Sequence, residues 1–341
     1  MLSKFELTQS RRPFWITLLV VSVAVTWTLW QNIELVAPPG LTRVSYLDVG
    51  QGDAIYINTQ AGHRLLIDGG PGQAVVGQVT GRLPVFDNTL DAIFLTHGDA
   101  DHLSGLVPLL SAVPVRAVFT TLVGRATQKY EDFLLTLEEK KIPVYRLAQG
   151  ATLNFGEAKF EVVSPGGALA NRILPKVNNT SLVILMTVGE RKFLFTGDIE
   201  SPIEQQIITR NSGLVDVLKV AHHGSKTSSS LEFLNAIQPA LAVFEVGAGN
   251  TYGHPAPEVL ARYKESRIWR TDQDGEINMF TDGQNIFVKA VADYFYHGAR
   301  GSPPTPCFAR LRKGRLPRNL SLGPHSVSSL GRGSPKSGVT R

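Results

Sequence analysis

Residues 96–102 read Thr96-His97-Gly98-Asp99-Ala100-Asp101-His102, which brings two imidazoles and two carboxylates together directly after an apolar run. The run Ala92–Leu95 predicts a buried strand. Gly98 and Ala100 occupy little space, so the side chains beside them can turn toward one point. Four such groups are costly to leave unpaired inside a protein, and both types are common metal ligands. The stretch therefore predicts a metal site at a strand end, rather than an ordinary polar turn.

Short apolar runs separated by glycine-containing turns continue on both sides of this motif and predict further strands. The predicted strands are Val44–Leu47, Ala54–Asn58, Arg64–Ile67, Asp91–Leu95, Leu182–Thr187, Lys192–Phe195, Asp216–Val220 and Ala240–Val246. Helices are expected near Leu106–Leu110, Gln128–Lys140, Ser201–Thr209 and Ser229–Ile237.

Two predicted hairpins resemble each other. One ends in Asp68-Gly69-Gly70 and the other in Thr196-Gly197-Asp198, and each follows a glycine turn and an apolar run. This pseudo-repeat suggests two β-rich halves whose sheets pack together with helices outside, a four-layer αββα sandwich of the α/β class. The length of 341 residues allows two domains, but we expect one, over residues 41–292.

An uncharged apolar stretch covers residues 14–30. As a helix it would be about 25 Å long, close to the ~30 Å hydrocarbon core of a bilayer. We therefore predict a transmembrane helix at residues 14–31. Basic residues precede it, so the positive-inside rule places residues 1–13 in the cytoplasm and the rest of the chain on the extracytoplasmic side of the plasma (inner) membrane. The alternatives are a twin-arginine signal cleaved after Ala37 and a buried helix of a soluble protein.

The net charge of +5 is unevenly distributed. Nine basic residues and no acidic residue lie at positions 300–341, so the rest of the chain is mildly acidic and does not by itself indicate nucleic-acid binding. Residues 297–341 are rich in Ser, Pro, Gly and Arg, which predicts a disordered basic tail. This tail either binds nucleic acid or anionic lipid or is a solvated extension. Cys307 is the only cysteine, which excludes an intrachain disulfide and argues against a thiolate metal ligand.

Two further strand ends carry metal-binding side chains. Asp198 follows the run Phe193–Phe195, where a carboxylate is well placed to bridge two cations, although Asp at such a position is also typical of turns and helix caps. His222 and His223 follow the run Val217–Val220. Adjacent side chains at a strand end point in different directions, so we expect one of the pair to bind metal and the other to support it or face the substrate.

The order and separation of these motifs, His-x-Asp-x-Asp-His, Thr-Gly-Asp and His-His-Gly-Ser, resembles the metallo-β-lactamase fold superfamily. The flanking sequence is more specifically similar to the C-terminal domain of the ComEC family of competence proteins, which are inner-membrane proteins of DNA uptake. The similarity covers residues 41–292. The stretches that carry it are Leu47–Ala54, Leu66–Gly70, Asn179–Val183, Lys219–Ser225 and Asn250–Pro255.

The resemblance implies a site for two divalent metal ions. The implied ligands are His97 and Asp99 for one ion and Asp101, His102 and His223 for the other, with Asp198 between them. Asp99 stands where hydrolytic lactamases usually have a histidine, and Asn179 or Ser181 stands near where another is expected. Oxygen ligands make the site harder, which favours manganese, with zinc or magnesium as the alternatives.

The resemblance also implies catalytic roles in phosphodiester hydrolysis. Two cations would activate a bridging water and stabilise charge on a phosphodiester oxygen. Asp101 would orient or deprotonate that water, while His222 and His254 would protonate the leaving oxygen or contact phosphate. For His254 the plain alternative is a turn residue beside Pro255.

Other charged residues lie within or near these motifs. Lys219 or Lys226 is expected to neutralise the charge of a substrate backbone. Asp53 and Asp68 are expected to hydrogen-bond the metal-binding loop.

The function implied by the resemblance is a membrane-anchored, metal-dependent phosphodiesterase, a nuclease that degrades DNA during competence-type uptake. ComEC proteins carry a multi-helix channel, whereas this sequence predicts one span, so a separate multi-span channel protein is an expected partner beside DNA and the membrane. The alternatives are a hydrolase of another phosphodiester or ester on the same fold, and a catalytically idle binding or assembly module of a split DNA-uptake system.

Overall fold

The computed structural model describes residues 15–23, 26, 40–84, 86–166, 177–210 and 213–290. The chain divides into two compact units, residues 1–38 and residues 39–341. In the first unit, residues 15–23 are helical. None of the helices among the described residues is long and apolar enough to cross a bilayer. The predicted span at 14–31 lies only partly within these residues, and the segments 1–13 and 297–341 lie outside them.

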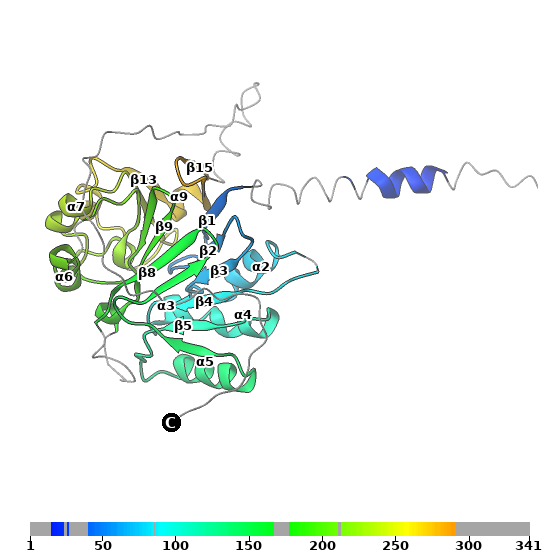
Figure 1. Ribbon diagram of the computed structural model, residues 1–341, viewed down its shortest axis with the longest axis horizontal. Helices are drawn as coiled ribbons and strands as arrows, with labels where there is room; N and C mark the ends of the chain where they lie inside the picture. The colour runs from blue at the N-terminus through cyan, green and yellow to red at the C-terminus, as the bar shows by residue number, and fades with distance from the viewer. Residues whose placement is uncertain are drawn as a thin grey trace, which may run out of the picture. The chain divides into compact units, whose positions relative to one another are not determined.

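The second unit contains two β-sheets (Figure 1). The first sheet has the strand order β15-β14-β1-β2-β3-β4-β5-β6. Its strands are β1 (Thr42–Tyr46), β2 (Ile55–Asn58), β3 (Arg64–Ile67), β4 (Ala92–Leu95), β5 (Val118–Thr120), β6 (Val144–Arg146), β14 (Ile277–Thr281) and β15 (Ile286–Ala290). β1 pairs antiparallel with both β2 and β14, so the hairpin at the end of the described region completes a sheet begun by the first strand.

The second sheet has the strand order β13-β12-β11-β10-β9-β8-β7. Its strands are β7 (Thr152–Phe155), β8 (Ala158–Ser164), β9 (Val183–Val188), β10 (Arg191–Phe195), β11 (Val217–Lys219), β12 (Leu241–Phe244) and β13 (Arg267–Arg270). β10 to β13 run parallel, while β7 to β10 form an antiparallel meander. In the first sheet β3 to β6 also run parallel, so each sheet is mixed.

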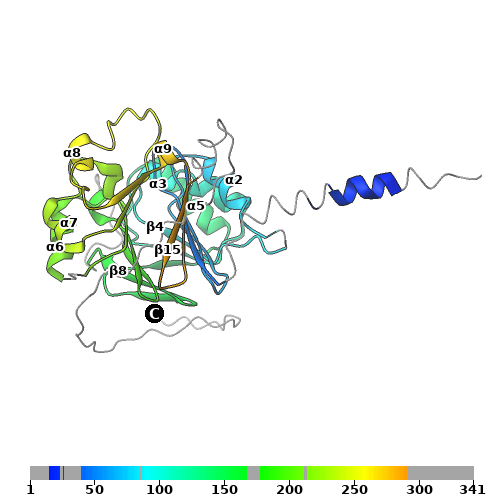
Figure 2. The same cartoon turned by 90° about the horizontal axis from the view of Figure 1, so that it is seen from above.

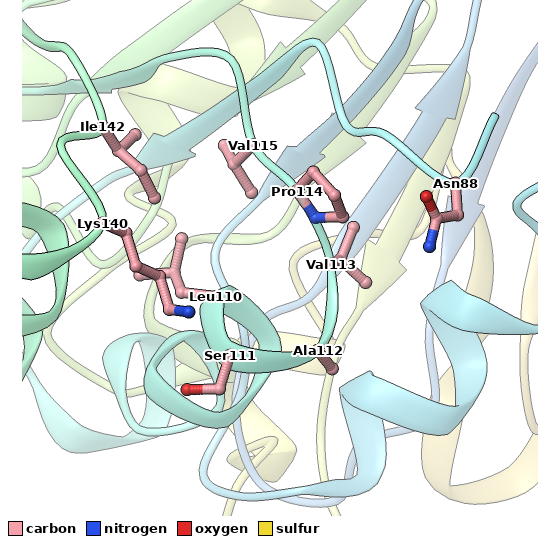
Figure 3. A pocket seen from close by; sticks show the side chains of 9 residues that line it. All are labelled: Asn88, Leu110, Ser111, Ala112, Val113, Pro114, Val115, Lys140 and Ile142. Carbon is pink, nitrogen blue, oxygen red and sulfur yellow. The ribbon is translucent and has the colours of Figure 1, made fainter.

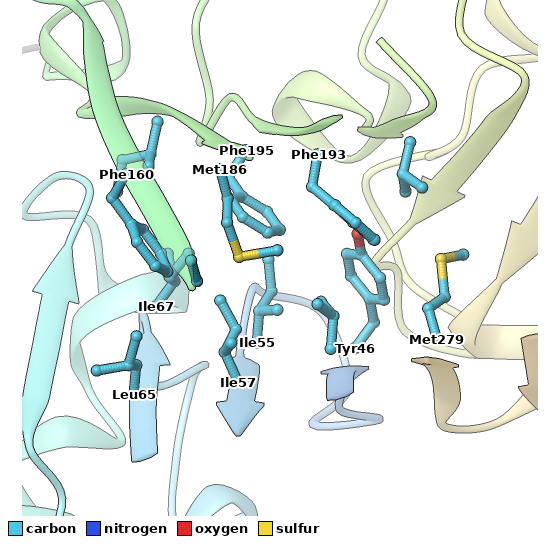
Figure 4. Close-up of a cluster of buried hydrophobic side chains, with 14 of the residues drawn as sticks. Tyr46, Ile55, Ile57, Leu65, Ile67, Phe160, Met186, Phe193, Phe195 and Met279 are labelled. Atoms are coloured by element: carbon cyan, nitrogen blue, oxygen red, sulfur yellow. The ribbon is translucent and has the colours of Figure 1, made fainter. Parts of the chain in front are cut away.

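A continuous apolar core lies between the sheets (Figure 4). Tyr46 and Ile57 of the first sheet and Phe160 and Phe193 of the second point into it, and all four side chains are almost completely buried. Burying apolar area at this scale is the main favourable contribution to folding. The two sheets therefore form a sandwich.

Helices cover the outer face of each sheet (Figure 2). The helices over the first sheet are α2 (Ala74–Thr80), α3 (Ala100–Leu103), α4 (Leu106–Ala112) and α5 (Gln128–Glu139). Those over the second are α6 (Ser201–Arg210), α7 (Leu231–Ile237) and α8 (Pro257–Leu260). A further short helix, α9 (Thr271–Asp274), follows β13. The predicted four-layer αββα sandwich is confirmed.

The central strands are apolar on both faces because both faces are covered. In β3, Leu65 and Ile67 face the core between the sheets, while Leu66 packs beneath the helices. In β4, Phe94 faces the core between the sheets and Ile93 packs beneath the helices. This is why these strands read as unbroken apolar runs rather than as alternating ones.

The sandwich brings loops of both sheets together at one edge. Leu182 N, which leads into β9, donates to Thr96 O, which follows β4, at 2.9 Å. Ala54 N donates to Glu245 Oε1, just beyond β12, at 3.0 Å. His222 N, after β11, donates to Gly197 O, after β10, at 3.2 Å. Hydrogen bonds thus join the loops that carry the motifs singled out in the sequence.

Gly105→Ala is expected to lower the free energy of unfolding by about 1–3 kcal/mol, because a Cβ there would press on Gly69 O and Gly72 O, which are backbone atoms that cannot move aside. Gly77→Ala is the matched control, since Gly77 lies in α2 with open space around its Cβ position, and it should be neutral or stabilising by up to ~1 kcal/mol. Urea denaturation of both variants measures the difference. Equal stability of the two would contradict the close approach at Gly105.

Candidate metal centre

The loop after β4 turns directly into α3. Asp99 is the N-cap residue of α3, but its carboxylate makes no capping hydrogen bond. Asp101 and His102 lie in α3 itself, a short helix that was not predicted, whereas the helix expected at Leu106–Leu110 is present as α4. The helical turn, rather than strand alternation, sets the directions of these last two side chains.

Four predicted ligands form one cluster, in which one potential ligand atom from each lies within 4.8 Å of the others: Asp101, His102, Asp198 and His223. His102 Nε2 lies 3.4 Å from Asp198 Oδ1. His223 Nε2 lies 3.6 Å from Asp198 Oδ2 and 3.3 Å from Asp101 Oδ2. Asp198 therefore stands between the two imidazoles.

The other two predicted ligands lie beside this cluster. His97 is fully buried, and its ring centroid lies 4.2 Å from that of His102. His97 Nε2 is 3.8 Å from Asp99 Oδ2. Burial and the neighbouring His102 charge lower the pKa of His97 to about 3, so its imidazole is neutral and offers a lone pair. The six predicted ligands thus occupy one region.

Unpartnered buried atoms test whether these residues fit a cation. Among the described residues, the buried side-chain atoms without a hydrogen-bond partner include three in this region: His97 Nε2, His102 Nε2 and Asp198 Oδ1. Leaving such atoms unsatisfied costs roughly 1–3 kcal/mol each. All three belong to predicted ligands. The residues therefore fit a divalent cation, and the six candidate ligands are enough to hold two such ions.

The outer nitrogens of the histidines are held by neighbouring groups. Asp68 Oδ2 lies 2.8 Å from His102 Nδ1, and the Asp68 carboxylate also accepts from the backbone and hydroxyl of Thr96 at 2.8 and 2.6 Å. His223 Nδ1 lies 2.7 Å from Glu245 O. A proton on each Nδ1 leaves Nε2 free to bind metal, the arrangement typical of metal histidines. The predicted supporting role of Asp68 is confirmed.

Of the two lysines expected to neutralise the charge of a substrate backbone, Lys219 is excluded by its burial. It is 1% exposed, its ammonium pairs with the Asp53 carboxylate, and Nζ also donates to Gly197 O at 3.2 Å. Nζ lies 3.7 Å from Asp198 Oδ1. Lys226 is the exposed lysine, and it pairs with Glu258 at 2.9 Å. Lys219 is therefore a buried positive charge beside the ligand cluster. The main contact of the Asp53 carboxylate is its ion pair with Lys219.

The charges in the cluster stabilise one another. Burial would lower the pKa of His102, but four surrounding carboxylates, with Asp198 foremost, raise it well above its ordinary value. Burial would raise the pKa of Asp198, but His223, His102 and Lys219 hold it well below its ordinary value. Burial likewise opposes charge on Lys219, and Asp53 and Asp198 raise its pKa. Each charged side chain in the cluster is thus stabilised in its charged form by oppositely charged neighbours.

The two adjacent histidines after β11 face different environments. Both have left-handed backbone conformations, with φ of 51° at His222 and 52° at His223. The side chain of His223 is 2% exposed and lies in the cluster, whereas that of His222 is 23% exposed. His222 Nε2 lies 3.9 Å from Asp198 Oδ2 and 3.3 Å from Asn178 Nδ2. His222 therefore stands at the rim of the cluster.

His254 approaches the same rim from the loop after β12. Its ring centroid lies 5.8 Å from that of His222. Burial, together with the nearby His223 and His222, lowers the pKa of His254. Its Nδ1 is buried and has no hydrogen-bond partner among the described residues. The structure thus places all three predicted catalytic side chains, Asp101, His222 and His254, around the cluster.

Two residues near the centre were not predicted. Arg125 Nη1 donates to Asp99 Oδ1 at 2.5 Å, across 26 positions of sequence, and no local pattern marks it. Glu245 is fully buried, and burial together with Asp53 raises its pKa well above the ordinary value. An acidic residue directly after the apolar strand β12 was a usable signal for Glu245, the same signal that marked Asp198.

The molecule also has a surface hollow of about 470 Å³ at the end of α4 (Figure 3). Its walls are mostly apolar, and no residue of the candidate metal centre lines it. The lining residues are Asn88, Leu110, Ser111, Ala112, Val113, Pro114, Val115, Lys140 and Ile142. The set contains no histidine or carboxylate, so it lacks the metal-binding side chains of the candidate centre.

Comparison with known proteins agrees with this geometry. Residues 47–244 match the family model of the metallo-β-lactamase superfamily. The chain is 30% identical over 257 residues to ComE operon protein 3 of Bacillus subtilis, which covers 69% of this chain and 32% of that protein. It is 31% identical over 253 residues to Recombination protein 2 of Haemophilus influenzae, and the alignment covers 72% of this chain and 30% of that protein.

A third relative, Competence protein ComA of Neisseria gonorrhoeae, is 28% identical over 248 residues, which covers 70% of this chain and 32% of that protein. The chain thus spans about a third of the length of these curated relatives. The resemblance to ComEC-type competence proteins is confirmed over about 70% of the chain. From the family match, the sandwich and the ligand cluster together, this chain belongs to the metallo-β-lactamase superfamily.

Proposed function

We propose that this chain is a metal-dependent phosphodiesterase that cleaves DNA. One observation carries the hydrolytic part of the proposal: the nearly closed cluster of Asp101, His102, Asp198 and His223, in which buried ligand atoms lack hydrogen-bond partners. The two carboxylates of this set supply oxygen ligands, which suit hard cations. Asp99 adds another oxygen ligand beside His97, which favours manganese over zinc.

The cations would supply an activated water and stabilise charge on the phosphodiester. Asp101 is placed to hold that water, because its side chain is 35% exposed and its Oδ2 lies in the cluster. Burial would raise the pKa of Asp101, but His102 and His223 lower it below its ordinary value. We propose that Asp101 orients the water from this position.

His222 is the side chain best placed to protonate the leaving oxygen. It stands at the rim, partly exposed, 3.9 Å from the Asp198 carboxylate. Asn178 and Thr227 lie within hydrogen-bonding distance of its two ring nitrogens, at 3.3 and 3.4 Å, and fix the ring. The ring of His254 lies next to that of His222, and we propose that it contacts phosphate or restricts rotation of the His222 ring. These positions suit proton transfer on the solvent side of the cluster.

The DNA part of the proposal rests on the relatives. Two of them are named a recombination protein and a competence protein. The family match over residues 47–244 contains all six candidate metal ligands. We propose on this basis that the substrate is DNA taken up in a competence-type process, and that a separate multi-span channel protein works with this chain.

We further propose that residues 14–31 anchor the chain in the plasma membrane, with the catalytic unit on the extracytoplasmic side. The uncharged sequence of residues 14–30 and the basic residues before it support this orientation. Protease treatment of spheroplasts tests it. Degradation of the catalytic unit in intact spheroplasts is expected, and protection until lysis would contradict the orientation.

The full chain, purified with Mn²⁺, is expected to cleave single-stranded or duplex DNA. Cleavage should stop with a chelator and return with Mn²⁺, and Mg²⁺ and Zn²⁺ should be compared at equal concentration. Turnover of bis(4-nitrophenyl) phosphate without DNA cleavage would instead favour another phosphodiester as substrate. Tight metal binding without turnover of any of these would favour a catalytically idle module of a split DNA-uptake system.

A further inference from the structure

An exposed aromatic ring lies next to the candidate centre. Tyr252 is 69% exposed and belongs to the loop between β12 and α8. Its ring lies parallel to that of His254, with a centroid distance of 6.1 Å and an interplanar angle of 12°. This is the geometry of an offset stack. One face of a large aromatic side chain is thus supported by a ring while most of its surface remains in water.

The loop that carries Tyr252 is internally braced. Asn250 Nδ2 donates to Gly247 O at 3.0 Å and to His254 O at 2.7 Å, and His254 N donates back to Asn250 Oδ1 at 3.1 Å. Gly247 N in turn donates to Gln51 Oε1 of the loop after β1 at 3.1 Å. Tyr252 is therefore presented on a fixed turn, and little conformational entropy is lost when a ligand stacks on it.

The stack leads directly to the hydrolytic groups. His254 lies 5.8 Å from His222, ring to ring, and His222 Nε2 lies 3.9 Å from the carboxylate of Asp198. Tyr252 is therefore the outermost ring of a short series that starts at the cluster. A phosphodiester held at the cluster would have its neighbouring substituents close to this ring.

From this arrangement we infer that Tyr252, supported by His254, is a stacking platform for a nucleobase adjacent to the cleaved phosphodiester. The inference deepens the proposed function and rests on it. Aromatic rings bind bases of any sequence because every base has a π-face. The platform would therefore favour nucleic acid over phosphodiesters without a flat aromatic group, and single strands, whose bases are free to stack, over duplex.

The test compares two oligodeoxynucleotides of equal length, one normal and one with abasic residues on both sides of the cleaved linkage. Tyr252→Ala in the full chain should raise KM for the normal oligonucleotide about tenfold with kcat nearly unchanged. It should not change KM for the abasic one. Tyr252→Trp should retain the wild-type KM, and its added indole fluorescence should be quenched by the normal oligonucleotide only.

Tyr145→Ala is the matched control, since Tyr145 is also exposed, at 52%, and stacks on another ring, that of Phe119, at the edge of the first sheet. It should leave both KM values unchanged. Equal effects of Tyr252→Ala on the two oligonucleotides, or no effect on either while the wild type cleaves both, would overturn the platform alone. Failure of the wild type to cleave any oligonucleotide would overturn the proposed DNA nuclease activity and the platform with it.

Discussion

Asp198→Asn is expected to lower kcat for DNA cleavage by at least about 100-fold, more than is typical for losing a residue that merely supports a metal ligand. Asp198 is 2% exposed, and its two oxygens face His102 and His223. Asparagine has nearly the same shape but is neutral and a much weaker cation ligand. The variant should therefore keep the fold while losing the group that stands between the two histidines.

Metal content separates this explanation from general damage. Elemental analysis after dialysis against Mn²⁺ should show fewer ions per chain in Asp198→Asn than in the wild type, with an unchanged far-UV circular dichroism spectrum. Asp282→Asn is the control, because Asp282 is exposed and only caps the turn between β14 and β15. Wild-type metal content and activity in Asp198→Asn would remove Asp198 from the metal centre.

Lys219→Met is expected to lower the free energy of unfolding of the metal-free protein by about 3–5 kcal/mol, the usual cost of breaking a buried ion pair. The lysine is 1% exposed and pairs with Asp53, with Asp198 Oδ1 3.7 Å from its ammonium. Methionine fills much of the same volume but leaves the Asp53 carboxylate buried without its countercharge.

Lys226→Met is the matched control, since Lys226 is 72% exposed in an ion pair with Glu258, and it should cost no more than about 1 kcal/mol. Guanidinium denaturation with a chelator present measures both variants, because bound metal would add its own stabilisation. Adding Asp53→Asn to Lys219→Met should recover part of the loss if the two side chains act as a pair. A fully additive double variant would show that they do not.

The alternation of side chains along β11 is enough to predict the inward orientation of Lys219. β11 reads Val217-Leu218-Lys219, and Val217 faces the core between the sheets while Leu218 packs beneath the helices. Side chains alternate along a strand, so Lys219 must share the inward face of Val217. A lysine there needs a buried carboxylate, which the chain supplies at Asp53.

The strands that sequence analysis recovered are those buried on both faces, such as β3 and β4, because they form unbroken apolar runs. Two of the strands it missed, β6 and β13, carry weaker patterns. β6 is short, and all of its residues are exposed, while β13 begins and ends with arginine. The pairing of β14 with β1 joins Thr281 to Thr42, and no local pattern encodes so distant a contact.

The same distinction applies to the candidate centre. The His97–His102 motif, Asp198 and the His222–His223 pair are each marked locally, as polar residues at the end of an apolar strand. Arg125 is not, because its importance comes only from its contact with Asp99 through the fold. Single residues that act through tertiary contacts are visible only once the sheets are assembled.

The ligand cluster draws on both layers of the sandwich. Asp101 and His102 belong to the helix that follows a strand of the first sheet, whereas Asp198 and His223 follow strands of the second. A cation bound there would tie the sheets together as a cross-link does, and at 100 times its Kd it would add about 2.7 kcal/mol to stability. The lifetime of this protein in a cell would then follow the supply of the ion, with starvation for the metal removing the protein as well as its activity.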